Sequence, residues 1–485
     1  MPLWRVWPVI FGLEGAVGAG RMDDGKQRVS KGASREGAET IERAGVERGN
    51  WGDSGGRGLH HRQRVSGGPG HAFVVLGLDF PEFPSSRSPA ARGPSERMTD
   101  RRAALPDDEI ERYRAQFPTL ARKTHLNTVS LGPLSSRSRE RVLEFLDLWE
   151  EFGASAWYRT WLGACAEARE RLGRLIGAQP EQVSLHGCVS NALAAVANSL
   201  DYTDRNEVVV ADLDFPTIPI QWLSRADQGI EVKYATSDDG ISVPLEQYEA
   251  LVSERTALIA TSQVFFTSGA VQDLGGLAAI AHRKGALLLV DAYQGTGQIP
   301  TDVRESDLDF LVTGGLKWLM GGPGLAYLYT APRLVDELRP TGSGWFAADH
   351  QFDFERRAFT YKPDGRRMET GTPAMAAVYA GLGGLEMLEA VGVSRAREHT
   401  LSMVEYLEQQ ASRRGLILGI PAEWAQRSGI VTLRMNDPAR VVKHLAAHGI
   451  ITDYRPGLVR VSPFFFTTTE DLDLFLAALD EIPAT

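Results

Sequence analysis

From about residue 183 onward, segments with the hydrophobic pattern of a strand alternate with segments that have the pattern of a helix. Short runs rich in β-branched and aliphatic residues predict strands, and between some of them the apolar residues recur at the spacing of a helix. The predicted strands span 208–211, 231–234, 258–262, 287–291, 310–313 and 325–329, and one helix between them spans 274–283. This alternation predicts an α/β domain with a mostly parallel sheet.

The regions before and after this domain are richer in helical spacing. Helices are predicted at 107–117, 139–152, 166–176, 374–391, 394–414 and 470–479, and short strands at 430–434 and 459–461. We therefore predict three folded parts. They are N-terminal helices and a loop in 98–182, a large domain in 183–345, and a linker with a smaller C-terminal α+β domain in 346–485.

The first hundred residues have no apolar period of either kind. They hold 18 of the 50 glycines, and residues 1–97 carry a charge of +3 whereas the remainder carries −13. Such a segment cannot bury enough apolar surface to offset its ordering entropy. We expect residues 1–97 to be a disordered leader or a mis-assigned segment upstream of a natural start at Met98. A signal peptide is a further alternative, against which Glu14 argues because it lies inside the apolar stretch.

Composition excludes several classes of protein. The 485 residues carry a net charge of −10, which disfavours binding to a nucleic-acid backbone. No run approaches the ~20 apolar residues that a membrane-spanning helix needs. The two cysteines, Cys165 and Cys188, are too few for a disulfide framework or a structural zinc site, and no metal site is predicted. We expect a cytoplasmic protein that has no nucleic-acid or membrane partner.

Two motifs at predicted strand ends indicate ligand binding. Segment 185–192 reads Leu-His-Gly-Cys-Val-Ser-Asn-Ala and opens a helix, whose first N–H groups are suited to hold a phosphate. The alternative is an ordinary helix start capped by Ser190. In segment 214–217, Asp-Phe-Pro-Thr, Phe215 is placed either to stack on a planar cofactor or to pack as a core residue in a proline turn.

Two further motifs contribute charged groups. The strand 287–291 ends in Asp291, three residues before Gln294, and a buried carboxylate there needs a cation such as a protonated ring nitrogen unless it caps a helix. Lys317 lies in the glycine-rich segment 313–324, where burial would lower its pKa and suit a Schiff base; a surface lysine on a loop is the alternative. A phosphate cradle, a stacking ring, an acid and a Schiff-base lysine together match what pyridoxal phosphate requires.

These motifs resemble those of the class V aminotransferase family of pyridoxal-phosphate enzymes, over about residues 127–479. The similarity is greatest to the kynureninase branch and to the cysteine-conjugate or sulfoxide lyases near it. The segments that carry it are 215–217 (Phe-Pro-Thr), 317–324 (Lys-Trp-Leu-Met-Gly-Gly-Pro-Gly), 344–346 (Gly-Trp-Phe), 367–373 (Arg-Met-Glu-Thr-Gly-Thr-Pro) and 460–463 (Arg-Val-Ser-Pro). The resemblance implies the aspartate-aminotransferase-like fold, which is fold type I of these enzymes, and a homodimer with shared active sites.

The resemblance also implies roles for residues around the cofactor ring. Lys317 would form the Schiff base with pyridoxal phosphate and later move the proton. Asp291 would pair with the pyridine nitrogen, and Gln294 would touch the ring hydroxyl. Phe215 would stack on the ring.

Other residues would hold the phosphate and the substrate. Cys188 and Val189 would offer phosphate contacts, mainly through backbone N–H groups. Arg460, with Arg455 nearby, would hold the α-carboxylate of the substrate. The residues expected to lie near or reach the cofactor of a partner subunit are Trp345, Gly371 and Thr372.

Departures from the resemblance bear on the reaction. Ile218 stands where kynureninases carry Asp, Gly371 stands where they often carry Asn, and the C-terminal cysteine of persulfide-forming desulfurases is missing. We therefore expect an enzyme that acts on an L-amino acid and cleaves a bond at the β-carbon, as a cysteine-conjugate or sulfoxide lyase or by kynureninase-like hydrolysis. A class V aminotransferase or an epimerase acting at Cα is the alternative, and an inert cofactor-binding protein is a third.

Overall fold

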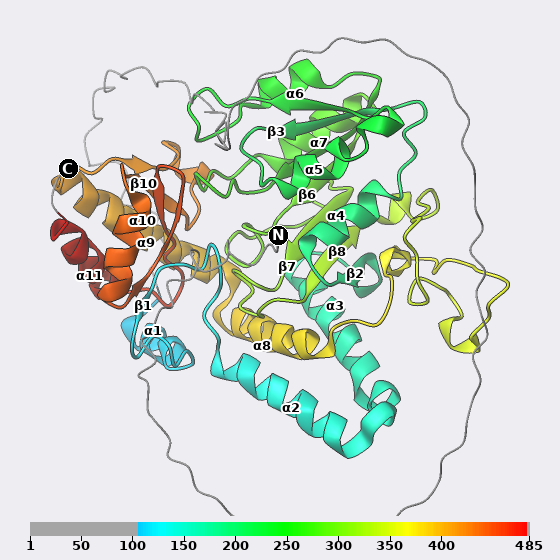
Figure 1. Ribbon diagram of the computed structural model, residues 1–485, viewed down its shortest axis with the longest axis horizontal. Coiled ribbons are helices and arrows are strands. Elements are labelled where there is room, and N and C mark those ends of the chain that lie inside the picture. The colour runs from blue at the N-terminus through cyan, green and yellow to red at the C-terminus, as the bar shows by residue number, and fades with distance from the viewer. Residues whose placement is uncertain (1–104, 483–485) are drawn as a thin grey trace, which may run out of the picture. The chain divides into compact units, whose positions relative to one another are not determined.

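A seven-stranded sheet lies at the centre of the large domain in the computed structural model, which describes residues 105–482 (Figure 1). In chain order its strands are β2 (Val183–His186), β3 (Glu207–Ala211), β4 (Glu231–Ala235), β5 (Thr256–Ser262), β6 (Leu287–Asp291), β7 (Phe310–Gly314) and β8 (Ala326–Thr330). They pair in the order β2-β8-β7-β6-β5-β3-β4, and β8 runs antiparallel to both of its neighbours. The predicted mostly parallel sheet is confirmed. The predicted leader, residues 1–97, lies outside the described residues.

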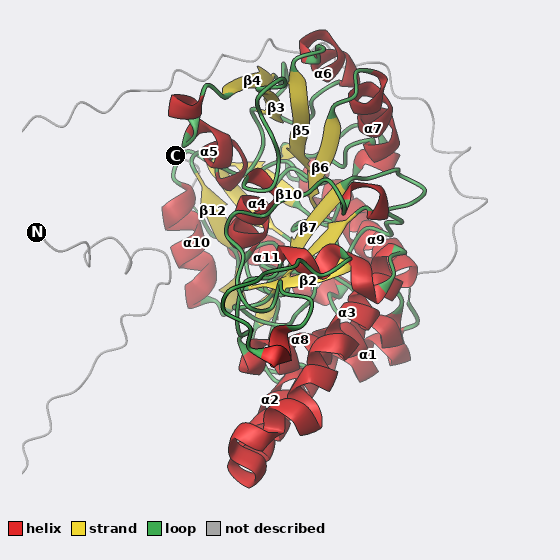
Figure 2. Cartoon of the chain, turned by 90° about the vertical axis from the view of Figure 1, so that its right-hand side faces the viewer, coloured by secondary structure: helices red, strands yellow, loops and turns green. Residues whose placement is uncertain are grey.

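Burial on both faces explains why these strands are continuous apolar runs rather than alternating ones. Every residue of β3, β5, β7 and β8 is buried. The helices that accompany these strands lie on both sides of the sheet (Figure 2). They are α4 (Val189–Ala197), α5 (Thr217–Leu223), α6 (Leu245–Leu251) and α7 (Leu274–Arg283). This arrangement brings the carboxyl ends of the parallel strands to one edge.

Three long helices pack together on the large domain. α2 (Ser136–Phe152) and α3 (Leu162–Ile176) both contact α8 (Met375–Val391), and residues along α8 belong to the large hydrophobic core. The close packing of α8 requires glycine, because a Cβ atom on Gly384 would overlap the carbonyl oxygen of Leu319. The prediction that placed 346–485 with the small domain is therefore wrong for α8. Periodicity identifies a helix but does not say which core its apolar residues enter.

The smaller domain is α+β and contains residues from both ends of the described chain. Its C-terminal elements are α9 (Val393–Arg413), β9 (Leu418–Gly419), β10 (Val431–Arg434), α10 (Pro438–Ala447), β11 (Ile450–Ile451), β12 (Asp453–Arg455), β13 (Leu458–Val461) and α11 (Thr469–Asp480). An antiparallel sheet has the order β12-β13-β10-β9. From the N-terminal side, after α1 (Asp107–Arg114), β1 (Thr124–His125) pairs in parallel with β11, and Leu126 enters the small core. The predicted boundary at residue 182 therefore misses this strand.

Shorter helical turns join these elements. They are Gly153–Ser155, Pro180–Gln182, Ala226–Gln228, Pro332–Leu334, Gln351–Asp353, Gly365–Met368 and Trp424–Gln426, with a π-helical turn at Trp157–Trp161. Within residues 105–482, no single helix is long and apolar enough to cross a membrane. The pair α8 and α9 meets the length and composition test only together, with a bend of 78° between them.

Candidate active site

A cavity of about 240 Å³ opens at the carboxyl edge of the large sheet. Its lining comes from the segments that follow β2, β3, β5, β6 and β7. Six residues that the sequence analysis selected line it together, namely Cys188, Val189, Phe215, Asp291, Gln294 and Lys317. Since strand ends meet at one edge of a parallel sheet, residues separated by more than a hundred positions share this cavity.

Lys317 enters the cavity from the loop after β7. Its backbone is held by the segment before α2, where the Gly132 amide donates a hydrogen bond to the Leu316 carbonyl oxygen at 3.0 Å. A Cβ atom on Gly132 would overlap the Lys317 carbonyl oxygen, so this approach needs glycine. The Lys317 Nζ lies 4.2 Å from the centre of the Tyr293 ring and 5.9 Å from that of Phe215. The amine is thus surrounded by aromatic surface.

Burial sets the protonation of Lys317 and Asp291. Loss of solvation, opposed by the charge of Asp291 and aided by the positive charges of Arg460 and Arg455, lowers the pKa of Lys317 to about 7. Burial likewise raises the pKa of Asp291, although the Tyr293 amide, 2.9 Å away, and the charge of Lys317 oppose the rise. At neutral pH a large share of the Lys317 amine is therefore unprotonated and nucleophilic.

Gln294 is fixed at both ends of its amide. Its Nε2 donates to the Val129 carbonyl oxygen at 3.0 Å, and its Oε1 accepts a hydrogen bond from the Trp318 Nε1 at 2.9 Å. The Val129 contact uses one of the two amide hydrogens, so one N–H remains for a ligand in the cavity. Trp318 follows Lys317 directly, which couples the position of the amide to that of the lysine.

The N-terminus of α4 forms another wall of the cavity. Cys188 is the N-cap residue in an extended conformation, and Val189 begins the helix. The Ser190 and Thr217 hydroxyls lie 2.7 Å apart and also line the cavity. A helix N-terminus with two hydroxyls is suited to hold a phosphate. From the sequence, Ser190 is expected only as a helix cap and Thr217 is not recognised as a cavity residue, because no local pattern brings α4 next to α5.

Phe215 is held at the cavity by a buried carboxylate beside it. The Asp214 side chain accepts hydrogen bonds from the Ala211 amide at 2.8 Å and from the Ser262 amide at 2.7 Å, which ties the end of β3 to β5. Burial outweighs these bonds and raises the pKa of Asp214 to about 7. The Phe215 ring stays 43% exposed and meets the Phe266 ring edge to face at 5.2 Å. An exposed face is what stacking on a ligand requires.

The two predicted carboxylate-binding arginines share one acidic partner. Arg460 is 1% exposed. It donates to Asp453 from Nε at 2.8 Å and also from Nη2. Its Nη1 donates to the Phe266 carbonyl oxygen at 2.7 Å, and its Nη2 donates to the Ser130 hydroxyl at 2.9 Å. Arg455 contacts the same Asp453 at 3.1 Å and keeps 35% of its side chain exposed. Arg460 thus has one unused N–H, so a bidentate pair with a substrate requires it to give up one of these partners.

Three predicted residues lie away from this cavity within one chain. Gly371 and Thr372 are exposed and line a second cavity of about 390 Å³ beside β2 and α4. Their turn is anchored by Glu369, which accepts hydrogen bonds from Arg169 at 2.6 Å and from the Leu185 amide at 3.0 Å. Trp345 lines neither cavity.

The residues around Lys317 fit pyridoxal phosphate. The cavity combines a buried amine of lowered pKa, a buried carboxylate, an amide with a free N–H, an exposed aromatic face and a helix N-terminus. Each of these groups matches one chemical feature of that cofactor: the aldehyde, the ring nitrogen, the ring hydroxyl, the ring face and the phosphate.

A family model for class-V aminotransferases matches residues 159–474. The chain belongs to this family. It is 36% identical over 374 residues to an uncharacterized aminotransferase, YcbU, of Bacillus subtilis, with 77% of this chain and 97% of that protein covered. It is 28% identical over 388 residues to a kynureninase of Geobacillus thermodenitrificans, with 76% and 90% covered.

Solved structures of similar proteins have the same fold as this chain. The complex of the cystine C-S lyase C-DES with cysteine persulfide superposes with a TM-score of 0.71 at 21% identity, covering 76% of this chain and all of the other. The apo cysteine desulfurase of Thermococcus onnurineus gives 0.70 at 20% identity, covering 76% and 97%. The predicted aspartate-aminotransferase-like fold, the type I fold of pyridoxal-phosphate enzymes, is confirmed.

The lowered pKa of Lys317 predicts how the cofactor-free protein reacts with pyridoxal phosphate. Only the neutral amine attacks an aldehyde, so the rate of adduct formation should rise as the pH rises through about 7 and level off above it. An ordinary lysine would keep gaining reactivity up to about pH 10. Stopped-flow absorbance of the adduct between pH 5.5 and 9.5 measures this. A rate that is still climbing above pH 9 would contradict the burial of the amine.

Proposed function

We propose that this class V enzyme uses pyridoxal phosphate to cleave a bond at the β-carbon of an L-amino acid. The observation that carries the proposal is the cavity in which Lys317, Asp291 and Gln294 meet at the ends of β6 and β7. The kynureninases and the cystine C-S lyase to which the chain is similar support this reaction type. An S-substituted cysteine or a kynurenine-like amino acid is the substrate class that we propose.

The residues of the chain divide the chemical work. Pyridoxal phosphate, when bound, supplies an electron sink for the negative charge that forms at Cα. Lys317 Nζ takes the proton from Cα, and its pKa of about 7 suits a base working at neutral pH. Asp291 would pair with the ring nitrogen, and the α4 N-terminus with Ser190 and Thr217 would hold the phosphate.

Substrate binding falls to the arginines beside the cavity. Arg455 and Arg460 bring two positive charges and Asp453 one negative charge, so a net positive charge remains for the α-carboxylate of a substrate. Arg455 is partly exposed, whereas Arg460 is buried. We propose that Arg455 makes the first contact and that Arg460 completes the pair once Asp453 releases it.

Replacing Arg460 with Ala should weaken substrate binding by about 10- to 150-fold, since a charged hydrogen bond is worth roughly 1.5–3 kcal/mol. Cofactor binding should change far less than substrate binding, because Arg460 does not line the Lys317 cavity. Spectroscopic titration with a non-reactive amino acid measures the binding. Exposed Arg440 on α10 offers a matched control, and Arg440→Ala should bind as the unaltered protein does. Equal binding by Arg460→Ala and the control would leave Arg455 as the carboxylate ligand.

Product analysis tests the reaction itself. The purified enzyme is incubated with S-substituted cysteines, a cysteine sulfoxide, kynurenine and common amino acids, each with and without an α-keto acid. Cleavage at the β-carbon predicts pyruvate, ammonia and a thiol from an S-substituted cysteine, with a sulfenic acid in place of the thiol from the sulfoxide. Hydrolysis of kynurenine by water predicts alanine and an aryl carboxylic acid, and neither reaction needs the keto acid. Turnover that depends on the keto acid and yields a new amino acid would contradict the proposal.

Transamination is the second candidate. The chain is 36% identical to an uncharacterized aminotransferase but 28% identical to a kynureninase, and the higher identity favours transamination. In this case Lys317 would still take the Cα proton, and no bond at the β-carbon would break. The keto-acid dependence in the same experiment separates the two reactions.

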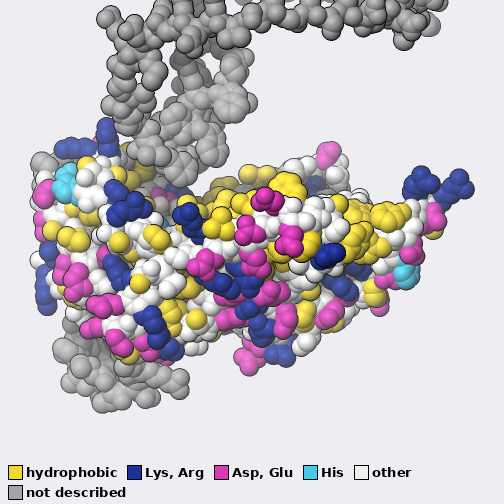
Figure 3. All heavy atoms as spheres, turned by 90° about the horizontal axis from the view of Figure 1, so that it is seen from below, with side chains coloured by type: hydrophobic (Ala, Val, Ile, Leu, Met, Phe, Trp, Pro, Cys, Tyr) yellow, Lys and Arg dark blue, Asp and Glu magenta, His cyan; other side chains and the backbone are white. Residues whose placement is uncertain are grey.

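We further propose that the enzyme is a homodimer with shared sites. Exposed hydrophobic side chains gather on α2 and on the segment around Trp345, and Figure 3 shows such side chains collected on part of one face. They are Leu143, Leu146, Trp149, Tyr158, Trp345, Phe352, Phe354 and Phe359. Exposed apolar surface of this extent marks an interaction site. We propose that in this dimer a second copy covers the patch and that Gly371 and Thr372 lie near the cofactor of the neighbouring subunit.

A further inference from the structure

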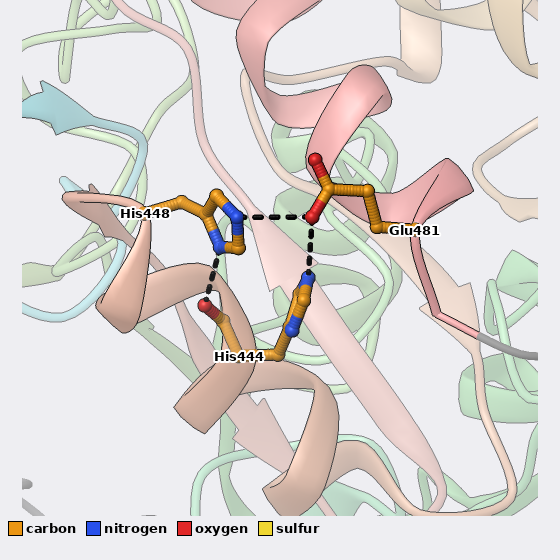
Figure 4. A group of neighbouring side chains, drawn as sticks. All are labelled: His444, His448 and Glu481. Carbon is orange, nitrogen blue, oxygen red and sulfur yellow. Dashed lines mark hydrogen bonds and ion pairs between the residues drawn. The ribbon is translucent and has the colours of Figure 1, made fainter.

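Two histidines and a glutamate meet on the small domain, apart from both cavities. His444 lies on the last turn of α10, His448 follows the last residue of α10, and Glu481 follows the last residue of α11 (Figure 4). The Glu481 carboxylate oxygen lies 3.0 Å from the His448 Nε2 and 3.8 Å from the His444 Nε2. One ligand atom from each of the three side chains lies within 4.8 Å of the others. All three side chains keep contact with solvent, so an ion can reach them.

Hydrogen bonding orients the His448 ring for coordination. The His448 Nδ1 lies 3.0 Å from the backbone carbonyl oxygen of His444, one turn earlier in α10. A carbonyl oxygen only accepts, so Nδ1 donates its hydrogen to it, and Nε2 is the nitrogen left to bind an ion. Nε2 faces the Glu481 carboxylate (Figure 4). An N–H bond to a backbone carbonyl is the usual outer contact of a metal-binding histidine.

The end of α11 adds negative potential at the same place. The Ala478 carbonyl oxygen lies 3.0 Å from the His444 Nε2. Because a carbonyl oxygen only accepts, the Nε2–H of His444 donates to it. A cation bound at His444 Nε2 would meet the same oxygen. The carbonyls at the C-terminus of a helix carry partial negative charge, which stabilises a cation nearby. Glu481 contributes a full negative charge.

We propose that His444, His448 and Glu481 form a binding site for a divalent transition-metal ion such as zinc or nickel. Two imidazole nitrogens and one carboxylate match the preference of these ions, whereas calcium and magnesium prefer oxygen ligands alone. A bound ion would join α10 to the end of α11 and so strengthen the small domain, since an ion that binds only the folded chain stabilises it. This site is independent of the proposed catalytic function.

The experiment compares ion binding by the holoenzyme and by a matched set of variants. The chain has ten histidines, and others of them can also bind Ni²⁺. The proposed site is therefore identified by the difference in Ni²⁺ binding between the unaltered protein and the variants. Isothermal titration with Ni²⁺ should give one class of binding in the unaltered protein that is absent from His444→Ala/His448→Ala/Glu481→Gln. Each single change should weaken this binding by at least about tenfold. His350, which is exposed beside Asp349, provides the control, and His350→Ala should bind as the unaltered protein does.

A second readout tests the ligand set itself. Cu²⁺ added at one equivalent should give an electron paramagnetic resonance spectrum with coupling to two nitrogens, reduced to one in His448→Ala. The melting temperature should rise with Ni²⁺ in the unaltered protein and in His350→Ala, but not in the triple variant. If the unaltered and triple-variant proteins bind Ni²⁺ with equal stoichiometry and affinity, the proposal is wrong. In that case Glu481 serves only as an ion-pair partner of the two imidazoles.

Discussion

Lys317→Ala should lower the turnover number of the enzyme by about 10²–10⁴-fold or more, because it removes both the amine that holds the cofactor and the base that moves the Cα proton. The loss should not come from unfolding, since Lys317 Nζ makes no hydrogen bond or ion pair with any other residue in the described part of the chain. Circular dichroism of the variant checks its fold. Steady-state assay with the best substrate from the product panel measures the turnover.

Borohydride reduction identifies the lysine directly. Reduction of the yellow holoenzyme should fix the cofactor on Lys317, and peptide mass spectrometry should find the mass increase there. Lys284, which forms a surface ion pair with Glu254 at 3.1 Å, is the control, and Lys284→Ala should keep full activity and the same adduct. An adduct on any lysine other than Lys317 would disprove the cofactor site.

Mixing two inactive variants should restore activity if the sites are shared between subunits. Lys317→Ala removes the amine of its own site, and Thr372→Arg would block the phosphate of the neighbouring site. A hybrid dimer then holds one unaltered site and one that carries both changes. Random exchange should recover about a quarter of the specific activity of the unaltered protein. Activity is followed during subunit exchange, and light scattering establishes the dimer.

The control for this mixture is a protein that carries both changes in one chain. Mixed with Lys317→Ala, it forms no site with an intact amine and an intact turn, so no activity should return. If exchange is demonstrated by labelled subunits and the first mixture also stays inactive, Thr372 serves the site of its own chain. The shared-site proposal would then be wrong, although the Lys317 assignment would stand.

The main residues of the candidate site could be predicted from sequence because each lies at a strand end with a distinctive neighbour. Asp291 ends an apolar run, and Lys317 follows one in a glycine-rich loop, and both patterns are local. Ser190 and Thr217 could not be recognised as a pair in this way, because their contact depends on how α4 packs beside α5. The His444 and His448 spacing is visible in the sequence, but Glu481 gives it meaning only after α11 folds back onto α10.

Hydrophobic periodicity and residue type act over a few positions, so the sequence alone predicts six strands of the mostly parallel sheet, most of the longer helices and the chemistry that each strand end offers. It does not predict α10 or the two- and three-residue strands of the small domain. The tertiary structure decided which groups share a site and which core each helix enters. Glycine at 132 has meaning only against the Lys317 backbone, and Arg460 meets Ser130 and the Phe266 carbonyl oxygen only in the folded chain. α8 joins the large core because Gly384 admits the Leu319 carbonyl. These contacts join residues far apart in the chain, and their geometry comes from packing rather than from local pattern.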